Sequence, residues 1–288
     1  MESGTPSSQI TPAPSHRKIT PTLIGAVMVL AGFIILLDQY LRTEWLSLTI
    51  VPAAGLMLLA NGLNTRRMGW IIPGLLVSSV GVGGVMLFGD LLGGAQVANR
   101  IGWGLASLSA GFSLILFFSL FYGKKHAWWA FLIAGILVGT AYPLITNHIS
   151  VFVLIYSISL ATGLAFLAWG FFERLLGLLI PGSLLTSIGP GFYLGFVKNA
   201  GSSELAQIGI LLTCFGLGWA LIILTYRMIN PVFLWWPLIP GGILAVVGWG
   251  LTIGGNKSIA MTLIGNTGSI GLIIFGLYLI LLRRGIRK

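Results

Sequence analysis

This sequence has unusually few charged residues. Only 8% of its 288 residues are charged, against about 25% in an ordinary soluble domain, and only six of them are acidic. A chain of this length that folded in water would need a polar surface, and so few charged side chains cannot provide one. The shortage excludes a water-soluble globular protein and indicates that lipid surrounds the fold.

Residues that carry chemistry are also few. The carboxylates all lie in the N-terminal tail or at the ends of apolar runs: Glu2, Asp38, Glu44, Asp90, Glu173 and Glu204. The three histidines, His16, His126 and His148, are far apart and lack the spacing of metal ligands. Nucleophile elbows, phosphate-binding loops and paired catalytic carboxylates are absent. We therefore expect no enzyme activity, no metal and no cofactor.

Cysteine occurs once, as Cys214. A single cysteine excludes an intramolecular disulfide and a cysteine-rich metal site.

Apolar runs dominate what is present. A membrane span needs about 17 to 25 mainly apolar residues. Ten runs qualify: 20–38, 45–63, 69–90, 101–122, 127–146, 150–172, 175–197, 206–226, 232–254 and 260–282. Residues 1–19 predict a disordered cytoplasmic tail, rich in Ser, Thr and Pro, and residues 20–288 predict one transmembrane helical domain. The expected fold is an all-α polytopic membrane helical bundle of about ten transmembrane helices.

The basic residues indicate how that bundle is oriented. With the N-terminus inside, twelve Lys and Arg fall on the cytoplasmic side and four fall on the other side: Arg42, Arg100, Lys198 and Lys257. Positive charge marks cytoplasmic loops, so both termini are expected in the cytoplasm, with the protein in the cell inner (plasma) membrane. In short loops, basic side chains contact anionic lipid headgroups. The net charge of +10 therefore indicates a bilayer partner and not nucleic acid.

One phrase recurs along the chain. Clear copies are Ile72-Pro73-Gly74, Ile180-Pro181-Gly182 and Ile239-Pro240-Gly241, and weaker copies end at Gly25 and Gly135. The intervals between the five glycines are 49, 61, 47 and 59 residues. The even-numbered runs carry glycines of their own, at Gly55, Gly111, Gly163, Gly218 and Gly271. Both series predict roughly five tandem two-helix units of about 54 residues.

The prolines of that phrase have a structural and a functional interpretation. Pro73, Pro181 and Pro240 each remove a backbone donor, so we expect each to kink its helix. The glycine that follows each proline lets a neighbouring helix approach closely. Alternatively, the kinks break helices around a binding cavity, as discontinuous helices do in transporters.

The segment Trp235-Trp236-Pro237-Leu238-Ile239-Pro240-Gly241-Gly242 resembles repeated helix hairpins in uncharacterised bacterial multi-pass membrane proteins. It is also similar to small helix-hairpin membrane regions of some cell-envelope stress proteins. The resemblance implies membrane hairpins and implies no particular functional residue.

Polar side chains within the apolar runs are the remaining candidates for a binding site. Asn266, Thr267 and Ser269 form the deepest cluster, and Thr213 is a possible facing partner from an earlier run. They either form hydrogen bonds between helices or line a path for a substrate. The leading hypothesis is a non-enzymatic multi-pass membrane protein with a structural, sensory or partner-binding role. The alternative is a transporter or permease for a small neutral or amphiphilic solute.

Overall fold

The computed structural model describes residues 21–41, 47–89, 93–122, 126–231 and 233–254, together with Gly265 and Ser269. All regular structure within these ranges is helical, which confirms the all-α class. The elements are α1 (Pro21–Leu41), the 3-10 turn η1 (Ser47–Thr49), α2 (Ile50–Thr65), α3 (Met68–Phe88), α4 (Val97–Tyr122), α5 (Trp128–Ile145), α6 (Val151–Glu173), α7 (Leu176–Phe192), the π-helical turn η3 (Tyr193–Lys198), α8 (Glu204–Ile229) and α9 (Leu238–Gly254).

The helices from α2 to α8 are long and apolar enough to cross a membrane, α2 with the help of η1 and α7 with the help of η3. α9 is apolar but shorter. The predicted run 260–282 lies outside the described residues, apart from Gly265 and Ser269. A multi-pass membrane protein is thus supported by seven helices, and the total of ten spans stays a prediction.

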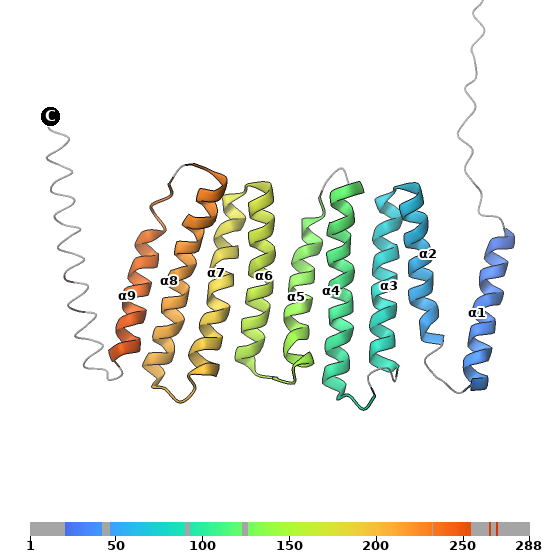
Figure 1. The fold of residues 1–288 in the computed structure, drawn as a ribbon, viewed down its shortest axis with the longest axis horizontal. Coiled ribbons are helices and arrows are strands. Elements are labelled where there is room, and N and C mark those ends of the chain that lie inside the picture. Colours follow the sequence, from blue (N-terminus) through green and yellow to red (C-terminus); the bar gives the residue numbers. More distant parts are fainter. Residues whose placement is uncertain are drawn as a thin grey trace, which may run out of the picture.

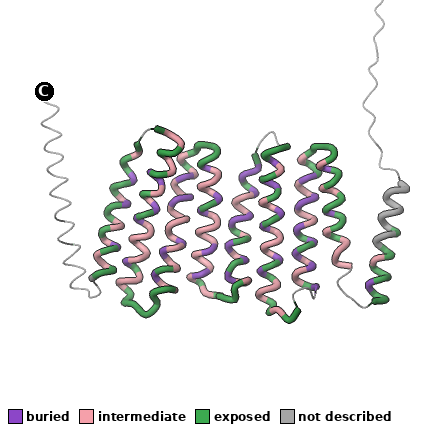
Figure 2. Tube along the Cα trace, in the orientation of Figure 1, coloured by how far each residue is buried: buried purple, intermediate pink, exposed green. Residues whose placement is uncertain are grey.

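The predicted helical bundle takes the form of a row. α2 to α9 stand side by side in chain order, alternately up and down (Figure 1). Apart from minor contacts, the described helices touch only the helices before and after them in the chain. α1 joins the row through η1, where the backbone N–H of Ser47 donates to Asp38 Oδ2 at 3.1 Å. A single row has two broad faces. Exposed residues occur on the turns, on the described part of α1 and along the helices of the row (Figure 2).

Glycines set the close spacing of α2 and α3. Gly55 and Gly62 on α2 pack against the backbone of Ser78 and Ile71, and Gly74 and Gly81 on α3 pack against α2 in return. A Cβ atom at any of these four glycines would overlap the partner helix. Each helix thus presents a glycine every seven residues to the other, which brings the two backbones close together.

The same arrangement recurs 108 positions later. Gly163 and Gly170 on α6 pack against Thr186 and Leu179 of α7, as Gly55 and Gly62 pack against Ser78 and Ile71. Gly182 and Gly189 on α7 pack against α6 in return. The turns correspond too, because the C-caps Arg66 and Arg174 both adopt left-handed backbone, with φ of 51° and 56°.

The prolines differ in their position within the helices. Pro73 and Pro181 are each the sixth residue of their helix, where a missing N–H removes a hydrogen bond. Pro240 is the third residue of α9, where N–H groups have no partner within the helix in any case. Among these three prolines, the physical reason for a kink therefore applies to Pro73 and Pro181 and not to Pro240. Bending at Pro73 and Pro181 stays a prediction.

Candidate functional site

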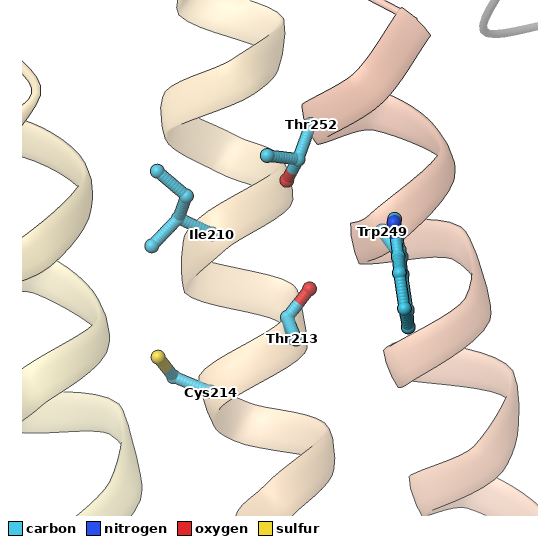
Figure 3. A pocket seen from close by; sticks show the side chains of 5 residues that line it. All are labelled: Ile210, Thr213, Cys214, Trp249 and Thr252. Carbon is cyan, nitrogen blue, oxygen red and sulfur yellow. The ribbon is translucent and has the colours of Figure 1, made fainter.

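A cleft between α8 and α9 is the candidate site. It has a volume of about 330 Å³ and is lined by Ile210, Thr213 and Cys214 of α8 and by Trp249 and Thr252 of α9. Thr213 is the residue that sequence analysis had placed among the polar candidates. Figure 3 shows Thr213 directed towards α9 and Thr252 directed towards α8.

The cleft exists because small residues let the two helices meet at close range. A Cβ atom on Gly209 would lie 2.5 Å from the carbonyl oxygen of Gly248, and one on Gly248 would lie 2.5 Å from the backbone N of Thr213. Gly216 packs against Ala245 in the same way.

The hydroxyl groups in the cleft bond to their own helices. Thr213 Oγ1 donates to the Gly209 carbonyl at 2.8 Å, and Thr252 Oγ1 donates to the Gly248 carbonyl at 2.8 Å. Such a bond satisfies the hydroxyl donor of a threonine in an apolar helix, so the hydroxyl needs no partner from another helix or from a ligand. Trp249 is 65% exposed and presents a large apolar surface at the mouth of the cleft. The site therefore suits an apolar chain or helix face better than a polar solute.

The other predicted site residues lie elsewhere. Asn266 and Thr267 fall outside the described residues. Ser269 is exposed, and its hydroxyl donates to the Gly265 carbonyl at 2.7 Å, again within one helical turn.

A second cleft lies between α3 and α4. Its volume is about 290 Å³, and its lining is wholly apolar: Val80, Gly83, Gly84, Leu87, Phe88, Ile101, Gly104, Leu105 and Leu108. Within the residues that the structure describes, no group of three or more His, Cys, Asp or Glu side chains lies close enough together to hold a metal ion.

Polar bonds between helices cluster at the α4–α5 and α5–α6 contacts. Ser109 Oγ donates to the Ala134 carbonyl at 2.8 Å, and Ser157 Oγ donates to the Gly139 carbonyl at 2.6 Å. Trp128 Nε1 donates to Glu173 Oε1 at 2.7 Å. These serines could not be predicted as helix contacts, because an isolated serine in an apolar run carries no sign of its partner.

No family model, curated protein or solved structure matches the chain.

Proposed function

We propose that this chain is a non-enzymatic multi-pass membrane protein with a structural, sensory or partner-binding role, and that its working surfaces are the faces of the helical row. The observation that carries the proposal is the arrangement of the helices. Described helices contact little besides their neighbours in the chain, and a single layer of helices encloses no path through the membrane. Each face is instead open to lipid or to another protein.

The proposal includes the finer topology. It has ten spans in five tandem two-helix units, both termini in the cytoplasm, and the inner (plasma) membrane as its location. Its support within the described residues is the charge of the turns. Arg66, Arg67, Arg174 and Arg227 lie at the end of the row that carries the α2–α3 and α6–α7 turns. These side chains would contact anionic headgroups of the cytoplasmic leaflet.

The alternative function is a transporter or permease for a small neutral or amphiphilic solute. Its support is the α8–α9 cleft, which contains Thr213 and opens between two helices. Transport through a single row would need further helices to close the path, supplied by a second copy or by residues outside the described ranges.

A flux measurement separates the two functions. A neutral solute such as glycerol should enter proteoliposomes that contain the purified protein no faster than it enters protein-free vesicles. Swelling that is faster with the protein, and that slows when Thr213→Trp fills the cleft, would establish transport and reject the proposal. Thr225→Trp is the matched control, because Thr225 lies on the same helix outside the cleft and also bonds its own helix, at 2.8 Å to Leu221.

A further inference from the structure

One face of α9 is uncovered. Trp235, just before the helix, is 64% exposed, Val246 is 44% exposed and Trp249 is 65% exposed. Gly242 is also exposed, and a Cβ atom added there would have no described atom of another helix within 4 Å. These four residues, which we call the α9 outer face, form an apolar surface with a small residue near its centre.

The counterpart of this face earlier in the row is in contact with the next helix. α4 and α5 correspond to α8 and α9 at an offset of 107 positions, because Gly102 packs against Ile145 as Gly209 packs against Thr252. The offset pairs the α9 outer face with four residues of α5: Trp128, Gly135, Gly139 and Tyr142.

Helix α6 contacts all four of these α5 residues, although Tyr142 stays 48% exposed. Trp128 stacks on Phe172 with ring centroids 5.5 Å apart and donates a hydrogen bond to Glu173. Gly135 packs against Ala161, Gly139 accepts the hydrogen bond from Ser157, and Tyr142 meets Tyr156 with ring centroids 6.4 Å apart.

The residues after α9 repeat the pattern of small residues in α6. At an offset of 108 positions, Ser157 corresponds to Gly265, Ala161 to Ser269 and Gly163 to Gly271. Thr49, Ala53 and Gly55 occupy the same three places in η1 and α2. Small residues at these places allow close contact with a glycine-bearing helix.

We propose that the apolar segment 260–282 packs on the α9 outer face as α6 packs on α5. Gly265 and Ser269 then face Val246 and Gly242, and the row gains a further helix. The proposal rests on the ten-span topology above. In the structure Gly265 and Ser269 are exposed, and Gly265 has no atom within 4 Å of its Cβ position, so small residues on both partners are uncovered.

Chain connectivity favours this segment over a second copy. Five residues separate Ile145 at the end of α5 from Val151 at the start of α6. Gly254 at the end of α9 is likewise followed, after five residues, by the start of the apolar segment at 260. A short link gives the segment a high effective concentration at α9, which a separate molecule has to match by affinity alone.

Paired cysteines test the contact. In a Cys214→Ala background, Gly242→Cys with Ser269→Cys should be joined by a short bifunctional thiol reagent in native membranes. The crosslinked protein would then run as a monomer, and neither of its two thiols would react with a thiol-specific mass tag added afterwards. Gly242→Cys with Gly271→Cys is the matched control and should stay open to the tag, because the counterpart of Gly271, Gly163, faces α7. Ser109→Cys with Ala134→Cys is the positive control, because these residues are in contact in the structure.

Three outcomes overturn the contact. In the first, both cysteines of the Gly242–Ser269 pair take the tag while the positive control is protected. In the second, the Gly242–Gly271 pair is protected equally well. In the third, the reagent gives a crosslinked dimer, which would place a second copy on α9. A reporter fused after Lys288 separates this result from the topology. A cytoplasmic reporter with no crosslink rejects the packing alone, whereas an external reporter rejects the tenth span itself.

Discussion

Glycines that look alike in the sequence have different surroundings in the row. Gly81 lies against Pro52 of α2, and its Cβ would overlap the ring and backbone of that proline. Gly84, one turn further along α3, has no atom within 4 Å of its Cβ position. The two residues therefore separate the effect of close packing from the effect of helix propensity.

Alanine at these two positions should have opposite effects on stability. Gly81→Ala should lower the free energy of unfolding by about 1 to 3 kcal/mol, because the added methyl group forces α2 and α3 apart. Gly84→Ala should be neutral or raise that free energy by up to about 1 kcal/mol, through better helix propensity. Thermal unfolding in detergent measures both. Equal destabilisation by the two substitutions would show that Gly81 does not mark a close helix contact.

Only part of the candidate site could be predicted from residue types. Thr213 could be predicted as a candidate because it is a polar side chain inside an apolar run. Trp249 and Thr252 were missed, because a tryptophan and a threonine near the end of an apolar run look like ordinary anchors. The seven-residue spacing of Gly209 with Gly216 and of Gly241 with Gly248 was the signal that could have paired the two helices.

At the scale of the helix, the predicted apolar runs agree closely with the structure. Hydropathy alone places a span where an apolar stretch lies between polar turns, and α3 to α8 lie where such stretches were expected. The start of α9 was placed too early, at 232, whereas the helix begins at Leu238. Pro237 explains the difference, because the residue before a proline is disfavoured in helical conformation and the helix starts after it.

Replacing two serines by alanine should lower the free energy of unfolding by different amounts, because only one of the two hydroxyl groups bonds to a neighbouring helix. Ser157→Ala removes the bond to the Gly139 carbonyl of α5 and should cost about 0.6 kcal/mol, with an upper limit near 1.7 kcal/mol. Ser187→Ala is the matched control, because the Ser187 hydroxyl bonds its own helix at Leu184 and should cost less. Thermal unfolding of the two variants in one detergent decides this. A larger loss for Ser187→Ala would contradict the role of Ser157 between the helices.

The arrangement of helices into a row could not be predicted from hydropathy. Helices that meet lipid on two faces and other helices on two sides are apolar all round, so their sequences carry little sign of which side meets a neighbour. The spacing of the marker glycines did hold a clue. The intervals of 49, 61, 47 and 59 residues alternate between short and long. The second and third intervals together span the 108 positions that separate the α2–α3 pair from the α6–α7 pair.

The proposed orientation of the chain in the membrane predicts on which side of the membrane a fused reporter lies. Fusions after Arg174 and Arg227 should report a cytoplasmic location, and fusions after Arg100 and Lys257 an external one, because basic residues are retained on the cytoplasmic side. A reversed result at Lys257 alone would place the error between Arg227 and Lys257, and would mean that α9 does not cross the membrane. A reversal at all four sites would keep the number of spans and invert the protein in the membrane.

A row and a closed bundle respond differently when the chain is cut. In a row, stability is the sum of contacts between neighbours, so a cut between Asn147 and His148 removes the α5–α6 contact and leaves α2–α5 and α6–α9 otherwise intact. Each half, expressed alone, should therefore insert, resist proteolysis and unfold cooperatively in detergent. A cut after Arg174 serves as the control, since it separates α6 from the glycine contacts of α7 and should leave less stable fragments. If both 147/148 halves are degraded alone and survive only when expressed together, the helices form a closed bundle in the membrane and the row is rejected.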